Sequence, residues 1–214
     1  MKINQYIDLT LLKTQSNVQD IKTLIDNAVK KEFFSVCINP FFVPFAKQYI
    51  QNRYHDSSLK IATVIGFPLG ATRTENKVHE AKLAIAQGAD EIDMVANISA
   101  FKSGLYDYVF SDINAVCALG KTVKVIIETS VLTDDEIVAM CKIFNKSNAL
   151  FIKTSTGFVG DGAKIEHIKL IKQNIDANKK IKASGGIRDI QTAQAMIQAG
   201  ADRIGTSSAH LWQE

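Results

Sequence analysis

The stretch FIKTSTG, residues 151–157, places a lysine at the end of an apolar run, directly before three hydroxyl residues and a glycine. Similar short runs, rich in β-branched residues, recur along the chain between segments with a helical pattern. We expect eight strands, over residues 6–11, 34–38, 61–65, 91–95, 123–127, 149–153, 181–184 and 203–206. Eight evenly spaced βα units in a chain of 214 residues indicate the α/β class and a single (β/α)8 TIM barrel domain, residues 1–214. A doubly wound open sheet is less favoured, because no GxGxxG follows an early strand.

Two of the intervening segments show how a helix should begin. Thr133 is followed three residues later by Glu136, which is the spacing of a capping box. Thr74 should cap a second helix that closes at Gly88, and Lys77 should lie on its solvent-facing side.

Composition excludes several classes of protein. The net charge is +3 and the basic residues are scattered, so no nucleic-acid-binding face is expected. No run of about 18 apolar residues or signal peptide is present, so we expect no membrane association. The cysteines are odd in number and widely spaced, which favours a reduced, cytoplasmic chain. The four histidines lack metal-ligand spacing, and we expect neither a metal nor another cofactor.

Polar residues stand near the predicted strand ends, where barrel enzymes carry their chemistry. The candidates are Asp8, Cys37, Asn39, Gly66, Asp93, Glu128, Lys153, Lys182, Ser207 and Ser208. Five of them have a simpler interpretation: Asp93 could cap or serve an ion pair, Lys153 could be an edge-strand residue that reaches solvent, Lys182 could belong to a solvated run of lysines, Cys37 could only pack, and Glu128 is expected to be a structural hydrogen-bonding partner. A barrel, however, would bring all of these positions to one end.

A pair of lysines is useful for covalent chemistry at a carbonyl. An amine attacks only as the free base, and its pKa falls when it is buried or lies beside a second cation. Two ammonium groups about 4–6 Å apart repel by roughly 3–4 kcal/mol at an effective dielectric near 20, which equals about 2–3 pKa units. Lys153 and Lys182 together therefore suit Schiff-base formation, and Asp93 could move protons directly or through water.

Glycine-rich stretches follow the last strands. SGGIRD, residues 184–189, and GTSS, residues 205–208, stand where TIM barrels bind phosphate, and TSTGF adds Gly157. Backbone N–H groups can approach an anion closely at glycines and at helix starts. The alternative is that these glycines only shape tight turns.

Six motifs carry a family resemblance: TVIGFPLGA (63–71), EIDMVANI (91–98), VKVIIET (123–129), FIKTSTGF (151–158), IKASGGIR (181–188) and RIGTSS (203–208). Together they resemble the deoxyribose-phosphate aldolase family over residues 6–208. The resemblance implies a (β/α)8 fold and a class I aldolase that needs no cofactor. Members reversibly cleave 2-deoxy-D-ribose 5-phosphate, a small sugar phosphate of deoxyribonucleoside catabolism, to D-glyceraldehyde 3-phosphate and acetaldehyde.

The resemblance also implies residue roles. Lys153 would form the Schiff base, Lys182 would tune its reactivity, and Asp93 would belong to the proton relay. Positions around the phosphate would be Gly157, Gly185, Gly186, Gly205, Ser207 and Ser208, and residues lining the pocket would be Asp8, Thr10 and Cys37.

The chain departs from the family pattern at three places. Leu9 replaces a histidine in DHTLL, at a position that the motif does not use in catalysis. Phe158 stands where some relatives have lysine, so phosphate binding should rest on backbone N–H groups. No tail tyrosine precedes Glu214, so protonation of the enamine carbon should be slower or depend on water.

Two rival functions stay open at this stage. One is a class I aldolase for a larger ketose phosphate, and the other is a non-catalytic barrel that senses a sugar phosphate. The sequence does not fix the oligomeric state, although barrels of this kind often pair through exposed helices, and a homodimer is compatible with it.

Overall fold

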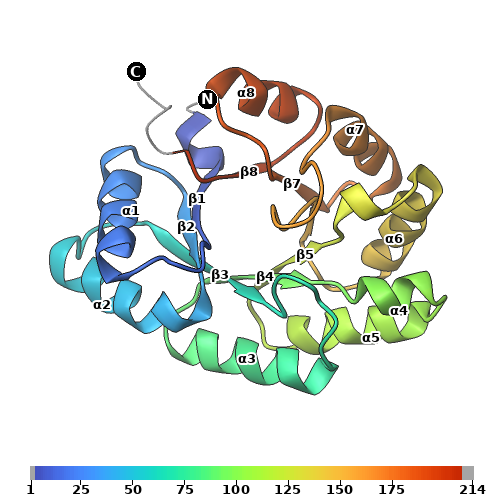
Figure 1. Ribbon diagram of the computed structural model, residues 1–214, viewed down its shortest axis with the longest axis horizontal. Coiled ribbons are helices and arrows are strands. Elements are labelled where there is room, and N and C mark those ends of the chain that lie inside the picture. Colours follow the sequence, from blue (N-terminus) through green and yellow to red (C-terminus); the bar gives the residue numbers. More distant parts are fainter. Residues whose placement is uncertain (1–2, 209–214) are drawn as a thin grey trace.

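The computed structural model describes residues 3–208, which form a closed barrel of parallel strands in the order β1 to β8 (Figure 1). Pairing of Ile7 with Ile204 closes the barrel between β1 and β8. The strands are β1 Ile7–Leu11, β2 Ser35–Ile38, β3 Lys60–Ile65, β4 Glu91–Val95, β5 Thr122–Ile126, β6 Phe151–Lys153, β7 Lys180–Ser184 and β8 Arg203–Thr206. The predicted barrel is confirmed, and each predicted strand differs by no more than two residues at an end.

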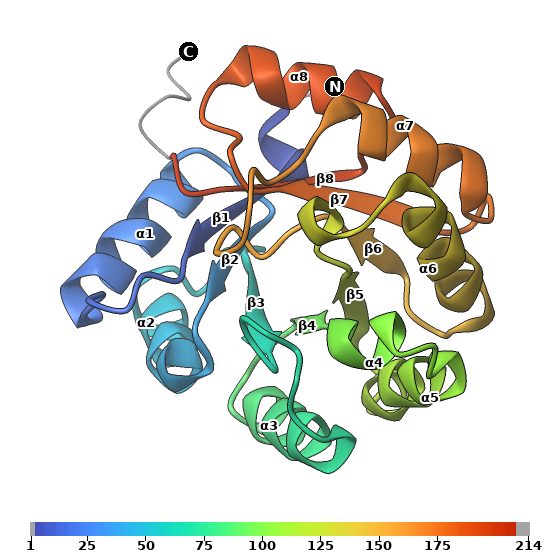
Figure 2. The same cartoon turned by 45° about the vertical axis from the view of Figure 1, so that its right-hand side comes forward.

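Helices surround the strands on the outside of the barrel, as Figures 1 and 2 show from two directions. They are α1 Val18–Lys30, α2 Val43–Arg53, α3 Thr74–Ala86, α4 Ile98–Lys102, α5 Tyr106–Cys117, α6 Asp134–Lys146, α7 Ile165–Asn174 and α8 Ile190–Gln198. Short 3-10 turns are η1 Ile3–Tyr6, η2 Pro40–Phe42 and η3 Thr129–Val131. A helix after β8 would lie outside the described residues. Within residues 3–208, no helix has the length and apolar character needed to cross a membrane.

Most of the apolar core lies between the strands and the helices, and a small second cluster of Leu12, Cys37, Ala62 and Val64 lies beside Asp93. In β4 the alternation of side chains sends Ile92 and Met94 into this core. The intervening residues, Glu91 and Asp93, are also buried, but they join ion pairs with residues of other strands. Both faces of β4 are therefore buried, but one face carries apolar side chains and the other carries charged ones.

Helix starts follow the sequence in one case and depart from it in another. The predicted capping box of Thr133 and Glu136 is present at α6. The expectation for Thr74 is wrong, because the helix begins one residue earlier than predicted and the Thr74 hydroxyl donates to Asp112 of α5 instead. A short polar side chain at a helix start can serve either the backbone or a neighbouring helix, and here tertiary contact decides.

The prediction that Lys77 faces solvent is also wrong. Its side chain is fully buried, and its Nζ lies 2.6 Å from Asp112 Oδ2 and 2.9 Å from the carbonyl oxygen of Val95. This lysine thus ties α3 to α5 and to the end of β4. The neighbouring residues Glu75 and Glu80 suggested a solvent-exposed helix face. That pattern gives no information about Asp112, the buried ion-pair partner on another helix.

Candidate active site

Asp93 is the centre of a buried ion-pair network inside the barrel. Its Oδ2 accepts from Lys153 Nζ and from Lys182 Nζ, each at 2.8 Å, and its Oδ1 accepts from Lys124 Nζ at 2.7 Å. Lys153 and Lys182 are direct neighbours in the register of β6 and β7, so their side chains leave the sheet at the same level. The structure therefore brings together the three residues that the sequence singled out for chemistry.

The network extends toward the N-terminal ends of the strands. Lys182 Nζ also lies 2.5 Å from Asp8 Oδ2, while Arg203 lies 2.8 Å from Asp8 and 3.2 Å from Glu91. Lys124 lies 2.7 Å from Glu91. Sequence reasoning missed Lys124, Glu91 and Arg203. The sequence feature that could have revealed them is the two-residue period of a strand, which places every second side chain on the same face. Glu91, for example, stands two residues before Asp93.

The pKa values of the two neighbouring lysines, Lys153 and Lys182, are shifted in opposite directions. Burial lowers the pKa of Lys153, and the positive charge of Lys182 lowers it further, although Asp93 opposes both effects. Burial also acts against the charge of Lys182, but the carboxylates of Asp8 and Asp93 outweigh it and raise the pKa of this lysine. Lys153 is thus the lysine prepared to lose its proton, and Lys182 is the one that keeps its charge.

The network contains one more cation than it contains carboxylates. Its cations are Lys124, Lys153, Lys182 and Arg203, and its carboxylates are Asp8, Glu91 and Asp93. If every group were ionised, one positive charge would be uncompensated in a buried space, which is costly. Loss of the proton from Lys153 makes the network neutral.

Asp93 and Cys37 are each held in one protonation state. Burial would raise the pKa of Asp93, but Lys124, Lys153 and Lys182 hold it well below its usual range. The pKa of Cys37 is raised by burial and then by the charge of Asp93, so its thiol stays protonated. Its Sγ lies 3.9 Å from Asp93 Oδ2, which makes Cys37 a weak donor and a packing residue.

A cleft of about 280 Å³ opens above Lys153 at the C-terminal ends of the strands. Loops after β1, β6, β7 and β8 line it. The lining residues are Thr10, Leu11, Leu12, Lys13, Lys153, Thr156, Gly157, Phe158, Ser184, Gly185, Gly186, Ile187, Arg188, Gly205, Thr206 and Ser207. Lys13 and Arg188 are exposed cations at its rim that sequence reasoning had not assigned to the site.

Most of the predicted substrate-binding residues line this cleft, but not all. Asp8, Cys37 and Ser208 are buried and are not among the lining residues. Asp93 and Lys182 are likewise not among the lining residues, so of the predicted catalytic residues it is Lys153 that reaches the cleft. Asp8 acts within the ion-pair network.

Two glycines of the site are required by close packing. A Cβ on Gly185, whose φ is +87°, would lie 2.8 Å from the Cα of Gly162. A Cβ on Gly205 would lie 2.9 Å from the Cβ of Ser184 and 3.2 Å from Cε of Lys182. Gly205 therefore leaves room for the lysine side chain as well as shaping the cleft.

Phe158 forms part of the cleft wall. Its ring meets the ring of Phe67, from the loop after β3, edge to face at a centroid distance of 5.1 Å. Its backbone N–H donates to Oγ1 of Thr156, 3.1 Å away, and is thus already engaged. Backbone N–H groups for an anion must therefore come from other positions of these loops.

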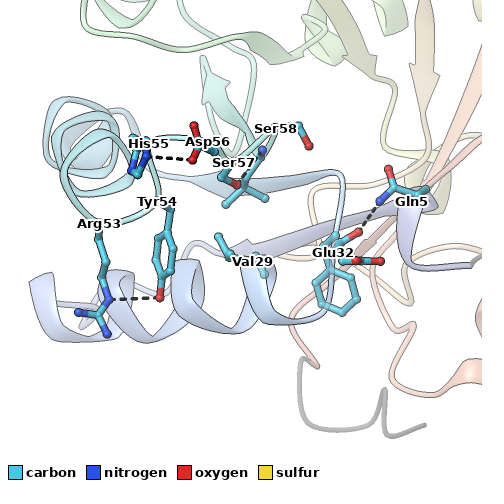
Figure 3. Close-up of a pocket in the computed structure, with 12 residues that line it drawn as sticks. Gln5, Val29, Glu32, Arg53, Tyr54, His55, Asp56, Ser57 and Ser58 are labelled. Carbon is cyan, nitrogen blue, oxygen red and sulfur yellow. Dashed lines mark hydrogen bonds and ion pairs between the residues drawn. The ribbon is translucent and has the colours of Figure 1, made fainter.

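A larger hollow, of about 580 Å³, lies near the N-terminal ends of the strands, between the ends of α1 and α2 and the start of β3 (Figure 3). Its rim carries the His55–Asp56 pair, 2.9 Å apart, and the hydrogen bond from Arg53 to Tyr54. No lysine lines it. Size therefore does not locate the chemistry of this molecule, and the lysine network places it at the smaller cleft.

Comparison with known proteins agrees with this geometry. The chain is 50% identical over 210 residues to the deoxyribose-phosphate aldolase of Finegoldia magna, covering 97% of each chain. It is 50% identical to the enzyme of the same name from Lactococcus lactis subsp. lactis, over 97% of this chain and 94% of that one.

Solved structures give the same result. A structure described as "QR15, an Aldolase" superimposes with a TM-score of 0.92 at 41% identity, over 98% of this chain and 93% of the other. A deoxyribose phosphate aldolase from Aeropyrum pernix, described as tetrameric, gives 0.88 at 30% identity, over 98% and 88%. The family model for DeoC/LacD aldolases matches residues 2–210. With its barrel, its paired lysines and these relatives, the chain belongs to the DeoC/LacD family of aldolases.

Proposed function

We propose that this protein is a deoxyribose-phosphate aldolase that works through a Schiff base on Lys153. It would cleave 2-deoxy-D-ribose 5-phosphate reversibly to D-glyceraldehyde 3-phosphate and acetaldehyde, in deoxyribonucleoside catabolism. The observation that carries the proposal is the sharing of one carboxylate, Asp93, by Lys153 and Lys182 at 2.8 Å each, with Lys153 at the cleft. The shared name of the half-identical relatives supports the choice of substrate.

The cleft accommodates a phosphate at the end away from the network. Gly185 and Gly186 in the loop after β7, together with Ser207 after β8, offer backbone and hydroxyl groups. Lys13 and Arg188 supply positive charge at the same rim. An open-chain sugar phosphate held there would extend its aldehyde toward Lys153.

Chemistry then follows from the protonation states. The neutral amine of Lys153 attacks C1 of the aldehyde, and loss of water gives an iminium ion. The carboxylate of Asp93, through water and with charged Lys182 beside it, takes the proton of the C3 hydroxyl. The C2–C3 bond breaks, its electrons flow into the iminium, and glyceraldehyde 3-phosphate leaves. The enamine is protonated at C2, and hydrolysis releases acetaldehyde and the amine.

Borohydride trapping tests this proposal. The protein is incubated with acetaldehyde and borohydride, and its peptides are analysed by mass spectrometry. A reduced two-carbon adduct is expected on Lys153, and Lys153→Leu should remain folded while turnover falls to background. Lys77 is an internal control, because it is equally buried but ion-paired away from the cleft.

Other outcomes would separate the rivals. An adduct on Lys182 would exchange the roles of the two lysines within an aldolase. A folded protein that binds a sugar phosphate but forms no adduct would favour the sensor. Turnover retained in Lys153→Leu would contradict the assignment, and preferential turnover of ketose phosphates would favour the other aldolase.

We also propose that the protein forms a homodimer and works in the cytoplasm. Large exposed side chains stand on the neighbouring helices α3 and α5, Leu83 on α3 and Tyr106 and Tyr108 on α5. Exposed side chains of this kind are typical of interfaces. The three cysteines are free, which supports a reducing compartment.

A further inference from the structure

Protonation of the enamine carbon needs an acid, and the ion-pair network supplies none that is well suited. Asp8 and Asp93 are held as carboxylates by their lysines, and the carboxylates hold Lys182 in its charged form. Glu128 is different. It follows β5, is 4% exposed, and takes part in no ion pair among residues 3–208.

The carboxyl of Glu128 is hydrogen-bonded to a residue of the cleft. The Thr156 hydroxyl donates to Glu128 Oε2 at 2.5 Å, and the backbone N–H of Thr156 donates to the same oxygen at 3.2 Å. Thr156 lines the cleft together with Lys153, three residues earlier in the chain. The pair therefore connects a buried acid to the space above the Schiff-base lysine.

The backbone at Glu128 is held in an unfavourable conformation. Its φ is +52°, in the left-handed region that residues other than glycine rarely adopt. This conformation turns the side chain toward the loop after β6, where Thr156 meets it. Strain of this kind, at the end of a barrel strand, is common at functional positions.

We propose that Thr156 is a further catalytic residue, which passes a proton from Glu128 to C2 of the enamine. The inference rests on the proposed function, because it needs the Lys153 enamine. Thr156 Oγ1 gives its proton to C2 as the new C–H bond forms and the enamine electrons move to that carbon, which restores the iminium. Glu128 gives its carboxyl proton to the same oxygen and becomes a carboxylate, which water in the cleft later reprotonates.

Electrostatics supports this assignment. Burial raises the pKa of Glu128, although hydrogen bonds from Thr156 and the charge of Lys153 act in the other direction. The Thr156 hydroxyl has the capacity for the transfer, because it accepts from the backbone N–H of Phe158 and keeps a second lone pair for the acid.

Hydrogen exchange at acetaldehyde isolates this step from cleavage of the sugar. In D2O, the Lys153 iminium of acetaldehyde loses a methyl proton and regains deuterium at the same carbon, which proton NMR follows directly. Glu128→Gln keeps an acceptor for Thr156 but cannot donate a carboxyl proton. We expect it to slow this exchange by about a hundredfold or more, the range of general acid–base catalysis, while borohydride still traps the Lys153 adduct at the wild-type rate.

Variants of the hydroxyl residues give the matched controls. Thr156→Val should slow exchange as Glu128→Gln does, and Thr156→Ser should restore it. Thr129→Val should exchange like the wild type, because the buried Thr129 hydroxyl has no hydrogen-bond partner among the residues that the structure describes. Thermal melts establish that each variant is folded.

Two failures can be told apart. If the wild-type protein exchanges hydrogen and Glu128→Gln or Thr156→Val exchanges it at the same rate, the proton relay is overturned. The proposed aldolase function is not affected by that result. Parallel loss of exchange and of trapping in Glu128→Gln would also overturn it, because the residue would then only shape the site. Absence of both exchange and trapping in the wild type would overturn the proposed function itself.

Discussion

At the scale of single residues, burial alone does not make a lysine reactive. Lys77 and Lys153 are both buried, yet their partners differ. Lys77 has Asp112 and a backbone carbonyl oxygen as its own acceptors. Lys153 shares one carboxylate with two other lysines, and its pKa is lowered. Lys124 and Lys182 share the same carboxylate but each contacts a second one, Glu91 or Asp8, so the decisive feature is the balance of carboxylates and cations around each lysine.

Removal of the neighbouring charge should change the pH dependence of activity. The proposed reaction needs neutral Lys153, so its rate should rise as the pH passes upward through the pKa of this lysine. Lys182 lowers that pKa, so Lys182→Met should move this rising limb to higher pH, by at least about one unit for charges within 4–6 Å. The measurement is kcat/KM against pH. Lys180→Met is the matched control, because Lys180 is an exposed residue of the same strand. An unmoved limb would count against the tuning role of Lys182.

At the scale of elements, the ends of strands and the helices behind them are fixed by polar contacts as much as by apolar packing. Lys77 joins α3 to Asp112 of α5 and to the end of β4. β4 also carries Asp93, so this contact supports the strand that holds the centre of the network. Gly66 leaves space for it, since a Cβ there would lie 3.0 Å from Cε of Lys77.

Breaking this contact should destabilise the protein. Lys77→Met leaves the carboxylate of Asp112 buried without its cation, which typically costs about 3–5 kcal/mol. Urea denaturation should show a lower midpoint. The double variant Lys77→Met/Asp112→Leu removes both charges and should recover much of the loss. A single variant as stable as the wild type would contradict the buried pair.

At the scale of the whole molecule, the barrel places its charges inside and its apolar core outside the strands. Interior strand positions carry the network around Asp93, while Ile92 and Met94 pack against helices. The surplus charge of this interior is what prepares Lys153. On the outer surface, large apolar side chains of α3 and α5 are exposed to solvent.

That surface yields a prediction about assembly. The wild-type protein should have the mass of a dimer in light scattering after size exclusion, and Leu83→Lys, on α3, should shift it toward the monomer. Phe41→Ser is the control, because Phe41 is 82% exposed but lies in η2, away from α3 and α5 in the sequence. A monomeric wild type, or a dimer unaffected by Leu83→Lys, would contradict an interface on these helices.

The sequence by itself determined the eight strands, their order and the lysines near strand ends. It could do so because β-branched runs alternate with helical patterns, and each element is a local property of its own residues. It also identified Asp93, Lys153 and Lys182, since a charged residue inside an apolar run is unusual enough to be noticed.

Only the tertiary structure decided which charges meet. Lys124, Glu91 and Arg203 look like ordinary strand residues until the barrel closes and places β5, β4 and β8 around one axis. Lys77 was misassigned for the same reason, because its partner lies 35 residues away on another helix. Protonation in a buried site depends on distances between residues remote in the chain, so closure of the barrel sets which lysine can react.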